Sequence, residues 1–437
     1  MNTINVGIIG VGTVGSGVMK LLNDNMEVIE KRLGARLHIK QVADKEPDRE
    51  RVIKIPDSLM TTDPWEIIQD ESVPIVVELI GGTTVAKELI LEAIDRGKHV
   101  VTANKALLAL YGEEIFSAAA KRGVDIGFEA SVGGGIPILR AIREGYVANR
   151  ILSIYGIING TSNYILTKMT EEGRRFDEVL KAAQKKGYAE ADPTLDINGG
   201  DAAHKLAIAV TLSFGTGIRL EDIYTEGIGN ITPLDINFAD EFGYKIKLLA
   251  VAKARNDGIE GIEVRVHPTL VEKGTPLANV SGVYNAIYIV GDALGPNMLY
   301  GMGAGMMPTA SAVVGDLVEI ARNIIYKTSR VVPPRSYQDS YITRLPIIPI
   351  THIVTRYYIR FQVVDKPGVL GQIAGILGKY NISIASVIQK ERKIGGDVPV
   401  VIMTHEARES DLIRSLEEID RLPVIKGRSV FIRIEDI

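Results

Sequence analysis

The chain has 437 residues, of which 46% are hydrophobic and 24% charged, and its formal net charge at pH 7 is −4. Because a single compact core rarely grows to this length, we expect about three domains. The charge provides no broad basic surface for a phosphate backbone, so nucleic acid is not an expected partner. No apolar run reaches the ~18 residues that suggest a membrane helix, and Met1 leads into a strand-like segment without the features of a signal peptide. We therefore expect a soluble, cytoplasmic protein without a membrane partner.

The sequence contains no cysteine. An aldehyde dehydrogenase that works through a thiohemiacetal needs a thiolate, and zinc alcohol dehydrogenases commonly use cysteine ligands, so both mechanisms are excluded. The histidines are scattered without the spacing of metal ligands. A proton donor is therefore expected to be Lys, Asp, Glu or Tyr.

The first ~130 residues alternate β-rich runs with amphipathic runs, which is typical of a doubly wound parallel sheet in an α/β fold. The predicted strands are Val6–Ile9, His38–Ala43, Pro74–Leu79, Lys98–Thr102 and Val124–Phe128. The predicted helices are Thr13–Lys31, Val85–Arg96 and Glu113–Arg122.

A glycine-rich turn follows the first predicted strand and opens the first predicted helix. It consists of Gly10, Val11, Gly12, Thr13, Val14 and Gly15. In this context the pattern predicts a Rossmann domain whose turn holds the pyrophosphate of a dinucleotide, although the glycines could also serve only a tight turn. Asp44 ends the second strand, where it could accept the ribose 2′-hydroxyl of NAD, whereas Lys45 could pair with the 2′-phosphate of NADP. Both coenzymes remain possible.

From residue 131 to residue 300 the pattern changes to longer helical runs and glycine-rich turns, which predicts a separate α+β domain. Gly301–Asn323 resembles a return to the first domain, which would then comprise residues 1–130 and about 301–325. Tyr164 and Lys168 have the spacing of the short-chain dehydrogenase pair. The glycine pattern that accompanies that pair cannot be drawn from the first turn, so we expect them to be neighbours on an ordinary helix.

The segment from Ala183 to Lys205 places several carboxylates and a lysine around turn residues. Gly199 and Gly200 should start a helix on which Asp201 and Lys205 lie four residues apart on one face. This pair could be an exposed ion pair that contributes ~0.3–0.5 kcal/mol. Alternatively, a partly desolvated Lys205, oriented by Asp201, could donate a proton to a carbonyl as the carbonyl carbon receives hydride.

The same segment resembles the signature of the homoserine dehydrogenases. Four further segments are similar to that family, namely residues 159–166, 102–105, 129–137 and 303–312. The resemblance covers roughly residues 1–325 and indicates the single-function form, without a preceding aspartate kinase. It implies NAD(P)-dependent interconversion of L-homoserine and L-aspartate 4-semialdehyde in threonine and methionine biosynthesis.

The resemblance also implies roles for individual residues. Lys205 would be the proton donor, Lys105 a second catalytic lysine near the nicotinamide, and Asp201 a catalytic and substrate-binding residue. The other implied substrate ligands are Gly187, Glu190 and Asp196. Implied coenzyme contacts beyond the glycine turn are Thr102, Lys105 and Gly303. A sodium ion would be held by Glu129 and by the carbonyls of Val132, Gly134 and Ile136, although this loop could equally, or in addition, be a hinge between domains.

Residues 326–356 are rich in turn residues and predict a linker, and residues 357–437 predict a ferredoxin-like β-α-β-β-α-β domain. Its predicted strands are Tyr358–Val364, Ile384–Gln389, Val398–Thr404 and Val424–Ile434, and its predicted helices are Val369–Tyr380 and Glu409–Asp420. Residues 365–382 resemble an ACT domain, which implies threonine as an effector; a dimerisation module without a ligand is the alternative. The homoserine dehydrogenase resemblance further implies that residues 131–300 form the catalytic and dimerisation domain of a homo-oligomer, either a dimer or a tetramer.

Two other functions fit less of the sequence. A related amino-acid dehydrogenase with another substrate would share the same coenzyme turn. A non-catalytic amino-acid sensor would have no need for Glu190, Asp201 and Lys205, and their presence argues against it.

Overall fold

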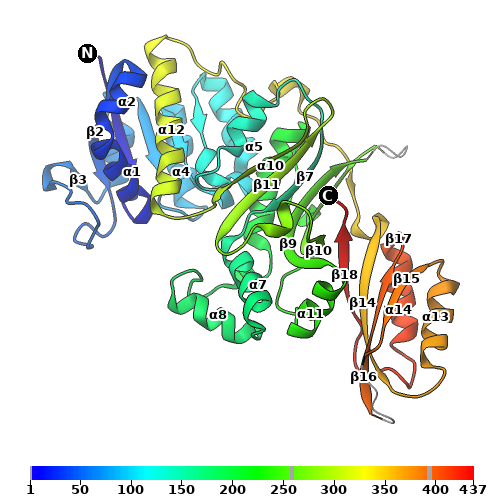
Figure 1. Cartoon of the computed structure of the whole chain (residues 1–437). Coiled ribbons are helices and arrows are strands. Elements are labelled where there is room, and N and C mark those ends of the chain that lie inside the picture. Colours follow the sequence, from blue (N-terminus) through cyan, green and yellow to red (C-terminus); the bar gives the residue numbers. More distant parts are fainter. Residues whose placement is uncertain (1, 256–259, 391–395) are drawn as a thin grey trace. The chain divides into compact units, whose positions relative to one another are not determined.

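The structure is a computed structural model that describes residues 2–255, 260–390 and 396–437. The chain forms two compact units (Figure 1). The first unit comprises Met1–Ile158, Asp201–Asp222 and Tyr284–Leu345, and the second comprises Asn159–Gly200, Ile223–Val283 and Pro346–Ile437. None of the helices in the described part of the chain has the length and apolarity needed to cross a membrane.

The first unit contains the predicted doubly wound sheet. Its strands are β1 (Asn2–Ile9), β2 (Ala35–Ala43), β3 (Met60–Thr61), β4 (Ile75–Glu78), β5 (His99–Thr102) and β6 (Ile126–Gly127). They pair in parallel in the order β3-β2-β1-β4-β5-β6. The order reverses between β1 and β4, and the carboxyl ends of strands at such a point form the usual ligand crevice of an open α/β sheet.

Helices cover this sheet on both faces (Figure 1). They are α1 (Thr13–Asp24), α2 (Met26–Leu33), α3 (Pro64–Gln69), α4 (Val85–Asp95), α5 (Lys105–Arg122) and α12 (Met306–Ile325). α12 packs against α1, where a Cβ added to Gly17 would lie 2.8 Å from Met306 Cγ. Buried apolar residues of α12 such as Val313 and Leu317 join the core of this sheet.

Two predicted helices have different boundaries in the structure. The predicted helix Thr13–Lys31 is wrong, because the chain breaks at Asn25, whose φ of −112° lies outside the helical region. α5 begins at Lys105 and not at Glu113, because the side chain of Asn104 accepts a hydrogen bond from the N–H of Leu107 and caps the helix.

The rest of the first unit adds an antiparallel sheet and a long helix. β7 (Ile151–Ile157) and β12 (Gly295–Met302) pair with opposite edges of β11 (Tyr284–Gly291). α10 spans Gly200–Phe214, as the glycine pair predicted. Short helical segments complete the unit: Asp57–Leu59, Glu129–Ser131, α6 (Ile138–Arg140), Ala141–Gly145, Leu220–Asp222 and Asp339–Tyr341.

The second unit is built on one mixed sheet in the order β9-β10-β18-β14-β16-β15. Its strands are β8 (Tyr224–Thr225), β9 (Tyr244–Ala254), β10 (Ile262–Glu272), β13 (Ile347–Ile348), β14 (Val354–Val364), β15 (Ile384–Ile388), β16 (Asp397–Thr404), β17 (Ala407–Arg408) and β18 (Val430–Glu435). Its helices are α7 (Gly160–Glu172), α8 (Phe176–Lys185), α9 (Thr194–Ile197), α11 (Pro233–Glu241), α13 (Val369–Lys379) and α14 (Glu409–Ile419).

The C-terminal part of the second unit has the predicted β-α-β-β-α-β order, with strands arranged β18-β14-β16-β15. The predicted start of the last strand at Val424 is wrong. Residues 422–427 form a turn, in which Ile425 N–H bonds to the carbonyl of Leu422 and Gly427 has a φ of +84°, so β18 begins at Val430. β18 also runs parallel to β10, which makes the ferredoxin-like sheet continuous with the β9–β10 pair.

Candidate functional site

The glycine turn at the carboxyl end of β1 has the geometry of a dinucleotide turn. Gly10 has a φ of +96°, and a Cβ there would lie 2.7 Å from the carbonyl carbon of Leu79. A Cβ on Gly15 would lie 2.1 Å from the carbonyl oxygen of Gly10, so only glycine lets α1 approach the turn so closely. Gly12 faces open space, with Arg49 Nη1 at 4.0 Å as the nearest atom to an added Cβ. These features correspond to a tight turn, close packing of the helix, and room for a pyrophosphate.

Asp44 follows β2 beside this turn, at the position where a carboxylate that binds the ribose of a dinucleotide is expected. Its Oδ2 accepts the N–H of Val11 at 2.9 Å, and its Oδ1 accepts the N–H of Glu46 at 3.0 Å. Arg51 Nη2 lies 3.4 Å from Asp44 Oδ2. Although burial raises the pKa of Asp44, these backbone bonds and Arg51 outweigh it and lower the pKa overall. The carboxylate is thus held against the turn and is partly neutralised.

Two lysines meet one aspartate at the N-terminal ends of α5 and α10. Lys205 Nζ donates to Asp201 Oδ2 at 2.7 Å and to the backbone carbonyl of Ile158 at 2.7 Å. Lys105 Nζ lies 3.2 Å from Asp201 Oδ1. The carboxylate of Asp201 therefore bridges the two ammonium groups, and its position in the first turn of α10 favours its negative charge. We call Lys105, Asp201 and Lys205 the lysine–aspartate cluster.

The cluster is desolvated but accessible from one side. The side chains of Asp201 and Lys205 are 7% and 11% exposed, whereas that of Lys105 is 36% exposed. His204 neighbours the cluster on α10, and burial, together with Lys105 and Lys205, lowers its pKa in spite of Asp201. The interpretation of Asp201 and Lys205 as an exposed ion pair is therefore wrong, because both side chains are buried.

Glu129 is buried beside the parallel sheet and holds the loop that follows it. Its Oε1 and Oε2 accept the N–H groups of Leu139 and Arg140, each at 2.8 Å. The N–H of Glu129 donates to Asp316 Oδ2 of α12 at 2.9 Å. Burial raises the pKa of Glu129, and it raises that of Asp316 to about 7. These bonds hold the loop after Glu129 in one conformation against α12.

The remaining residues of the predicted sodium site lie in this same loop. Gly134 has a φ of +55°, and a Cβ there would lie 2.5 Å from the carbonyl carbon of Gly303, so the two glycines bring their segments into close contact. The carbonyl of Ile136 accepts the N–H of Ile138 at 2.8 Å. Among the described residues, no group of three or more His, Asp or Glu side chains could hold a metal ion. A cation here would depend on backbone carbonyls such as that of Val132.

The other predicted substrate residues belong to the second unit. Asp196 Oδ1 accepts the side-chain amide of Asn159 at 2.7 Å, and the other end of that amide accepts the N–H of Ser162 and caps α7. Glu190 is exposed, and Gly187 ends α8 with a φ of +73°. Asp196 thus fixes the side chain of Asn159 at the start of α7, whereas Glu190 is exposed to solvent.

Tyr164 and Lys168 are neighbours on α7, as predicted. Tyr164 is buried, and its ring lies 4.9 Å from that of Tyr188. Lys168 Nζ pairs at the surface with Glu171 at 2.9 Å and Glu172 at 3.1 Å. Neither arrangement has the form of a catalytic tyrosine activated by its lysine.

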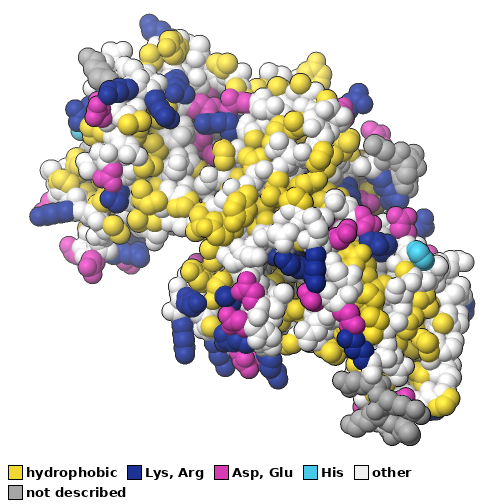
Figure 2. Space-filling model, in the orientation of Figure 1, with side chains coloured by type: hydrophobic (Ala, Val, Ile, Leu, Met, Phe, Trp, Pro, Cys, Tyr) yellow, Lys and Arg dark blue, Asp and Glu magenta, His cyan; other side chains and the backbone are white. Residues whose placement is uncertain are grey.

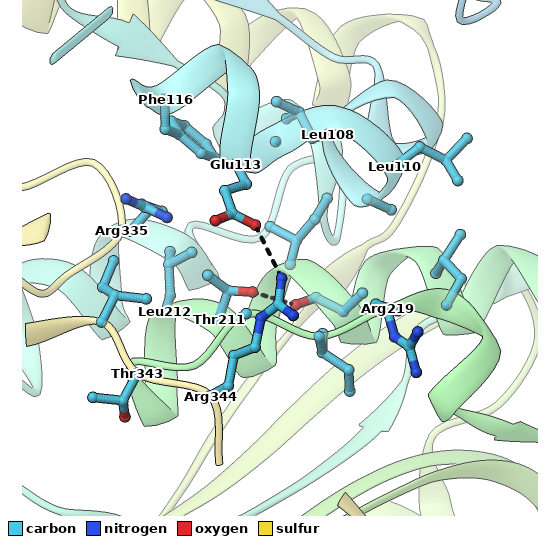
Figure 3. Close-up of a pocket in the computed structure, with 18 of the residues that line it drawn as sticks. Leu108, Leu110, Glu113, Phe116, Thr211, Leu212, Arg219, Arg335, Thr343 and Arg344 are labelled. Carbon is cyan, nitrogen blue, oxygen red and sulfur yellow. Dashed lines mark hydrogen bonds and ion pairs between the residues drawn. The ribbon is translucent and has the colours of Figure 1, made fainter. Parts of the chain in front are cut away.

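A cavity of about 540 Å³ lies between α5 and α10 in the first unit (Figure 3). Its walls include Leu108 and Phe116 of α5 and Leu212 of α10. Figure 3 shows Arg344 reaching toward Glu113, 3.9 Å away. Among the described residues that line this cavity, none is a predicted site residue, so it adjoins the helices of the lysine–aspartate cluster without being part of the cluster.

A smaller cavity of about 390 Å³ lies in the C-terminal domain, where β14 turns into α13. Asp365, Lys366, Pro367 and Gly368 form one side, and Gln389 lies on another. Gly368 has a φ of +88°, which only glycine adopts readily. The predicted ACT motif therefore forms a concave loop of a size that fits an amino acid.

Sequence reasoning missed three groups at these sites. Asn104 could have been found, because Asn directly before an apolar helical run is a capping signal. Arg51 and the carbonyl of Ile158 carried no such signal. Arg51 Nε donates to the carbonyl of Val11, 40 residues away, and Ile158 lies 47 residues from Lys205. Local patterns do not report such contacts.

Comparison with known proteins gives three matches to family models. Residues 10–129 match the NAD binding domain of homoserine dehydrogenase, residues 137–318 match homoserine dehydrogenase, and residues 357–424 match the ACT domain. The chain is 46% identical over 437 residues to a homoserine dehydrogenase from Neisseria gonorrhoeae, with 100% of both chains covered. It is 45% identical over 438 residues to one from Pseudomonas aeruginosa, again with 100% of both covered.

Solved structures agree with these matches. A homoserine dehydrogenase from Thiobacillus denitrificans has a TM-score of 0.93 and 45% identity, with 100% of this chain and 99% of that chain covered. A hyperthermophilic archaeal homoserine dehydrogenase mutant in complex with NADPH has a TM-score of 0.63 and 26% identity, with 75% of this chain and 99% of that chain covered. The predicted Rossmann domain and the predicted ACT domain are both confirmed.

Proposed function

This chain belongs to the homoserine dehydrogenase family, and we propose that the lysine–aspartate cluster is the site at which it interconverts L-homoserine and L-aspartate 4-semialdehyde. It is an NAD(P)-dependent oxidoreductase. The observation that carries the proposed site is the buried carboxylate of Asp201, which bridges Lys105 and Lys205.

The cluster fits the acid–base half of a hydride transfer. The bound dinucleotide supplies or accepts a hydride at its nicotinamide ring. In the reductive direction, Lys205 Nζ donates a proton to the aldehyde oxygen as the carbonyl carbon gains hydride, which gives the alcohol. Asp201 and the carbonyl of Ile158 hold Nζ in one orientation, so the donor does not have to be ordered during the reaction. Lys105, the more exposed lysine, orients the coenzyme or the substrate.

Substrate recognition is proposed to use the charges of the amino acid. A carboxylate such as Glu190 suits the substrate ammonium group. Asp196 and Gly187 would contribute by shaping the segment that carries Glu190, because Asp196 already bonds to Asn159 and Gly187 forms the turn after α8.

For the coenzyme, we propose that the turn accepts NADP. Thr102 and Gly303 complete the proposed set of contacts with the glycine turn and Lys105. Arg51 partly neutralises Asp44, so this carboxylate would repel a 2′-phosphate less than an unpaired aspartate would. Arg49 lies beside the open space that Gly12 leaves for the pyrophosphate. The related archaeal enzyme was solved with NADPH.

A sodium ion at the Glu129 loop remains a proposal. One carboxylate and several carbonyl oxygens are a donor set that suits a hard cation. Each oxygen of Glu129 accepts one N–H and retains a lone pair for a ligand. The carbonyls of Val132, Gly134 and Ile136 would supply the other contacts and hold the loop; the effect of sodium on the melting temperature would test this.

Regulation by threonine is proposed for the Asp365–Gly368 loop. The cavity there is enclosed partly by backbone, whose N–H and carbonyl groups can bind the carboxylate and ammonium of an amino acid. Threonine should inhibit the enzyme, and Gly368→Ala, which strains the left-handed turn, should weaken that inhibition. Inhibition that persists unchanged in this variant would place the effector elsewhere.

We further propose that the chain forms a homo-oligomer through the face of β11 and β12. Figure 2 shows hydrophobic side chains gathered over these two strands. Tyr284, Leu294, Tyr300 and Met302 are exposed there, and the rings of Tyr284 and Tyr300 stack at 5.0 Å. Exposed apolar patches of this kind mark interaction surfaces. We expect Tyr300→Lys to shift the protein toward the monomer, and sedimentation velocity would measure this shift.

The reaction itself is tested with purified protein, aspartate 4-semialdehyde and either NADPH or NADH. We expect oxidation of the reduced coenzyme and formation of L-homoserine. Measurable turnover would exclude a non-catalytic amino-acid sensor. Faster turnover of another amino-acid aldehyde would favour a related dehydrogenase.

A further inference from the structure

Glu78 is a buried carboxylate at the carboxyl end of β4 that has no role in the site described above. Its side chain is 0% exposed, and burial raises its pKa. Its Oε1 accepts the N–H groups of Ile80 at 2.9 Å and Gly81 at 3.2 Å. Its Oε2 accepts the hydroxyl of Thr102 at 2.7 Å. One side chain thus ties together the turns that follow β4 and β5.

The bond to Thr102 continues to the start of α5. Thr102 Oγ1 accepts the N–H of Asn104 at 3.0 Å. The side chain of Asn104 accepts the N–H of Leu107 at 3.1 Å and donates to the carbonyl of Gly82 at 2.7 Å. Asn104 is the capping residue of the helix whose first residue is Lys105. The direction in which Lys105 leaves the sheet therefore depends on this chain of bonds.

The turn that is held by the bonds to Ile80 and Gly81 also contacts the glycine turn that is proposed to bind the coenzyme. The backbone of Leu79 and Ile80 passes so close to Gly10 that an added Cβ would lie 2.7 Å and 2.9 Å from its atoms. A shift of the turn after β4 would therefore displace the glycine turn as well. Glu78 thus connects the glycine turn with Lys105 through buried and partly buried bonds.

We propose that Glu78 is a positioning residue for hydride transfer, which sets the placement of Lys105 relative to the coenzyme turn. The proposal rests on the proposed role of the lysine–aspartate cluster. It depends on the polarity of the bonds, because an ionised carboxylate only accepts, so Thr102 donates its proton to Glu78 while its oxygen accepts the N–H of Asn104. A displacement of about 1 Å at a reacting group can lower a rate about a hundredfold.

The first test replaces the acceptor while keeping its shape. Glu78→Gln replaces one carboxylate oxygen by an amide NH2 group, so either the bond from Thr102 or the two bonds from Ile80 and Gly81 lose their acceptor. We expect kcat/KM for homoserine to fall about tenfold or more. The matched control is Glu92→Gln, which removes an exposed carboxylate paired with Arg96 on α4 and should leave kcat/KM within about twofold.

A second pair of variants guards against misfolding of Glu78→Gln. Thr102→Val keeps the shape of the side chain and removes the hydroxyl, whereas Thr102→Ser keeps the hydroxyl. We expect Thr102→Val to lose activity as Glu78→Gln does and Thr102→Ser to retain more of it. A merely structural role predicts losses that follow the melting temperature. Equal activity of the Val and Ser variants would overturn the proposal.

A double-mutant cycle with Lys105→Met decides whether Glu78 acts through Lys105. We expect Glu78→Gln to change kcat/KM less than about twofold in the Lys105→Met background, because the group that it positions is already missing. Multiplicative losses would overturn the proposal. If Lys105→Met is as active as the unmodified chain, the proposed function of the cluster fails instead, so the two failures are distinguishable.

Discussion

The lysine–aspartate cluster of the first unit and the ionic network of the second unit use the same chemical groups in opposite ways. In the first unit, Asp201 bridges two lysines, and the side chain of Lys105 remains 36% exposed. In the second unit, Arg433 and Glu409 pair at 2.6 Å with 1% of each side chain exposed, and Arg433 also reaches Glu226 at 2.9 Å. One cluster is open to a ligand, whereas the other is closed by its own partners.

The two clusters also differ in what they connect. Arg433 and Glu435 lie on β18, the strand shared by the ferredoxin-like sheet and the β9–β10 pair. Glu435 pairs with Arg265 and with Lys253, both from that pair of strands. The second network thus joins two parts of one sheet, while the first holds the Nζ of Lys205, the proposed proton donor, in place. Burial and completeness of pairing, not residue type, separate the structural charges from the proposed catalytic charges.

The comparison predicts the largest effect for Lys205→Ala. Removing the proposed proton donor should lower kcat by about 10²–10⁴, while the coenzyme still binds. Steady-state kinetics and a coenzyme titration measure these quantities on the same preparation. Near-normal turnover would remove Lys205 from the mechanism.

Arg433→Met should lower the stability of the fold and leave catalysis largely unchanged. Breaking one side of a fully buried ion pair costs about 3–5 kcal/mol of folding free energy, because Glu409 would be left buried without its partner. The activity per folded molecule should change much less. Denaturant unfolding followed by active-site titration would check both parts, and a fall in kcat without a loss of stability would contradict the distinction.

The buried network should also make the second unit sensitive to acid. The pKa of Glu435 is lowered to about 2 by Arg265 and Lys253, which outweigh its burial, and burial holds the pKa of His267 well below 6.5. Both pKa values are lower in the folded than in the unfolded chain, so the stabilisation that these two groups provide is fully present above about pH 6.5. As the pH falls, this stabilisation should decrease first when His267 of the unfolded chain gains a proton. It should decrease further below about pH 4.5, when Glu435 of the unfolded chain gains a proton. Unfolding midpoints measured from pH 7 to pH 3 test this, and a flat profile would contradict it.

The smallest effect is expected for Lys168→Met. Lys168 pairs only with surface carboxylates on α7, and such pairs contribute little. We expect kcat within about twofold of the unmodified chain. A loss comparable to that of Lys205→Ala would revive the short-chain dehydrogenase interpretation of Tyr164 and Lys168.

Much of the fold was predictable from local sequence patterns. The alternation of strands and helices, the glycine turn and the β-α-β-β-α-β order of the tail all depend on residues close in the chain. The break at Asn25 and the late start of β18 were missed because helix and strand ends depend on caps and turns that weak local signals describe poorly.

The candidate site divides in the same way. The Asp201 and Lys205 pair was predicted, because its two members lie one helical turn apart. The bridge from Asp201 to Lys105 and the bond to Ile158 join segments distant in sequence, and the network of Arg433 has partners more than 200 residues away. Spacing alone could not separate a buried pair from an exposed one, since burial is decided by the packing of α5 and α10.

The most direct test of the account follows the hydride itself. The purified chain is incubated with aspartate 4-semialdehyde and NADPH that carries deuterium at the transferred position of the nicotinamide, and the product is examined by mass spectrometry. We predict L-homoserine with one deuterium on the carbon that bears the hydroxyl, formed by the unmodified chain and only at a greatly reduced rate by Lys205→Ala. Unlabelled homoserine, or no homoserine at all, would contradict the account.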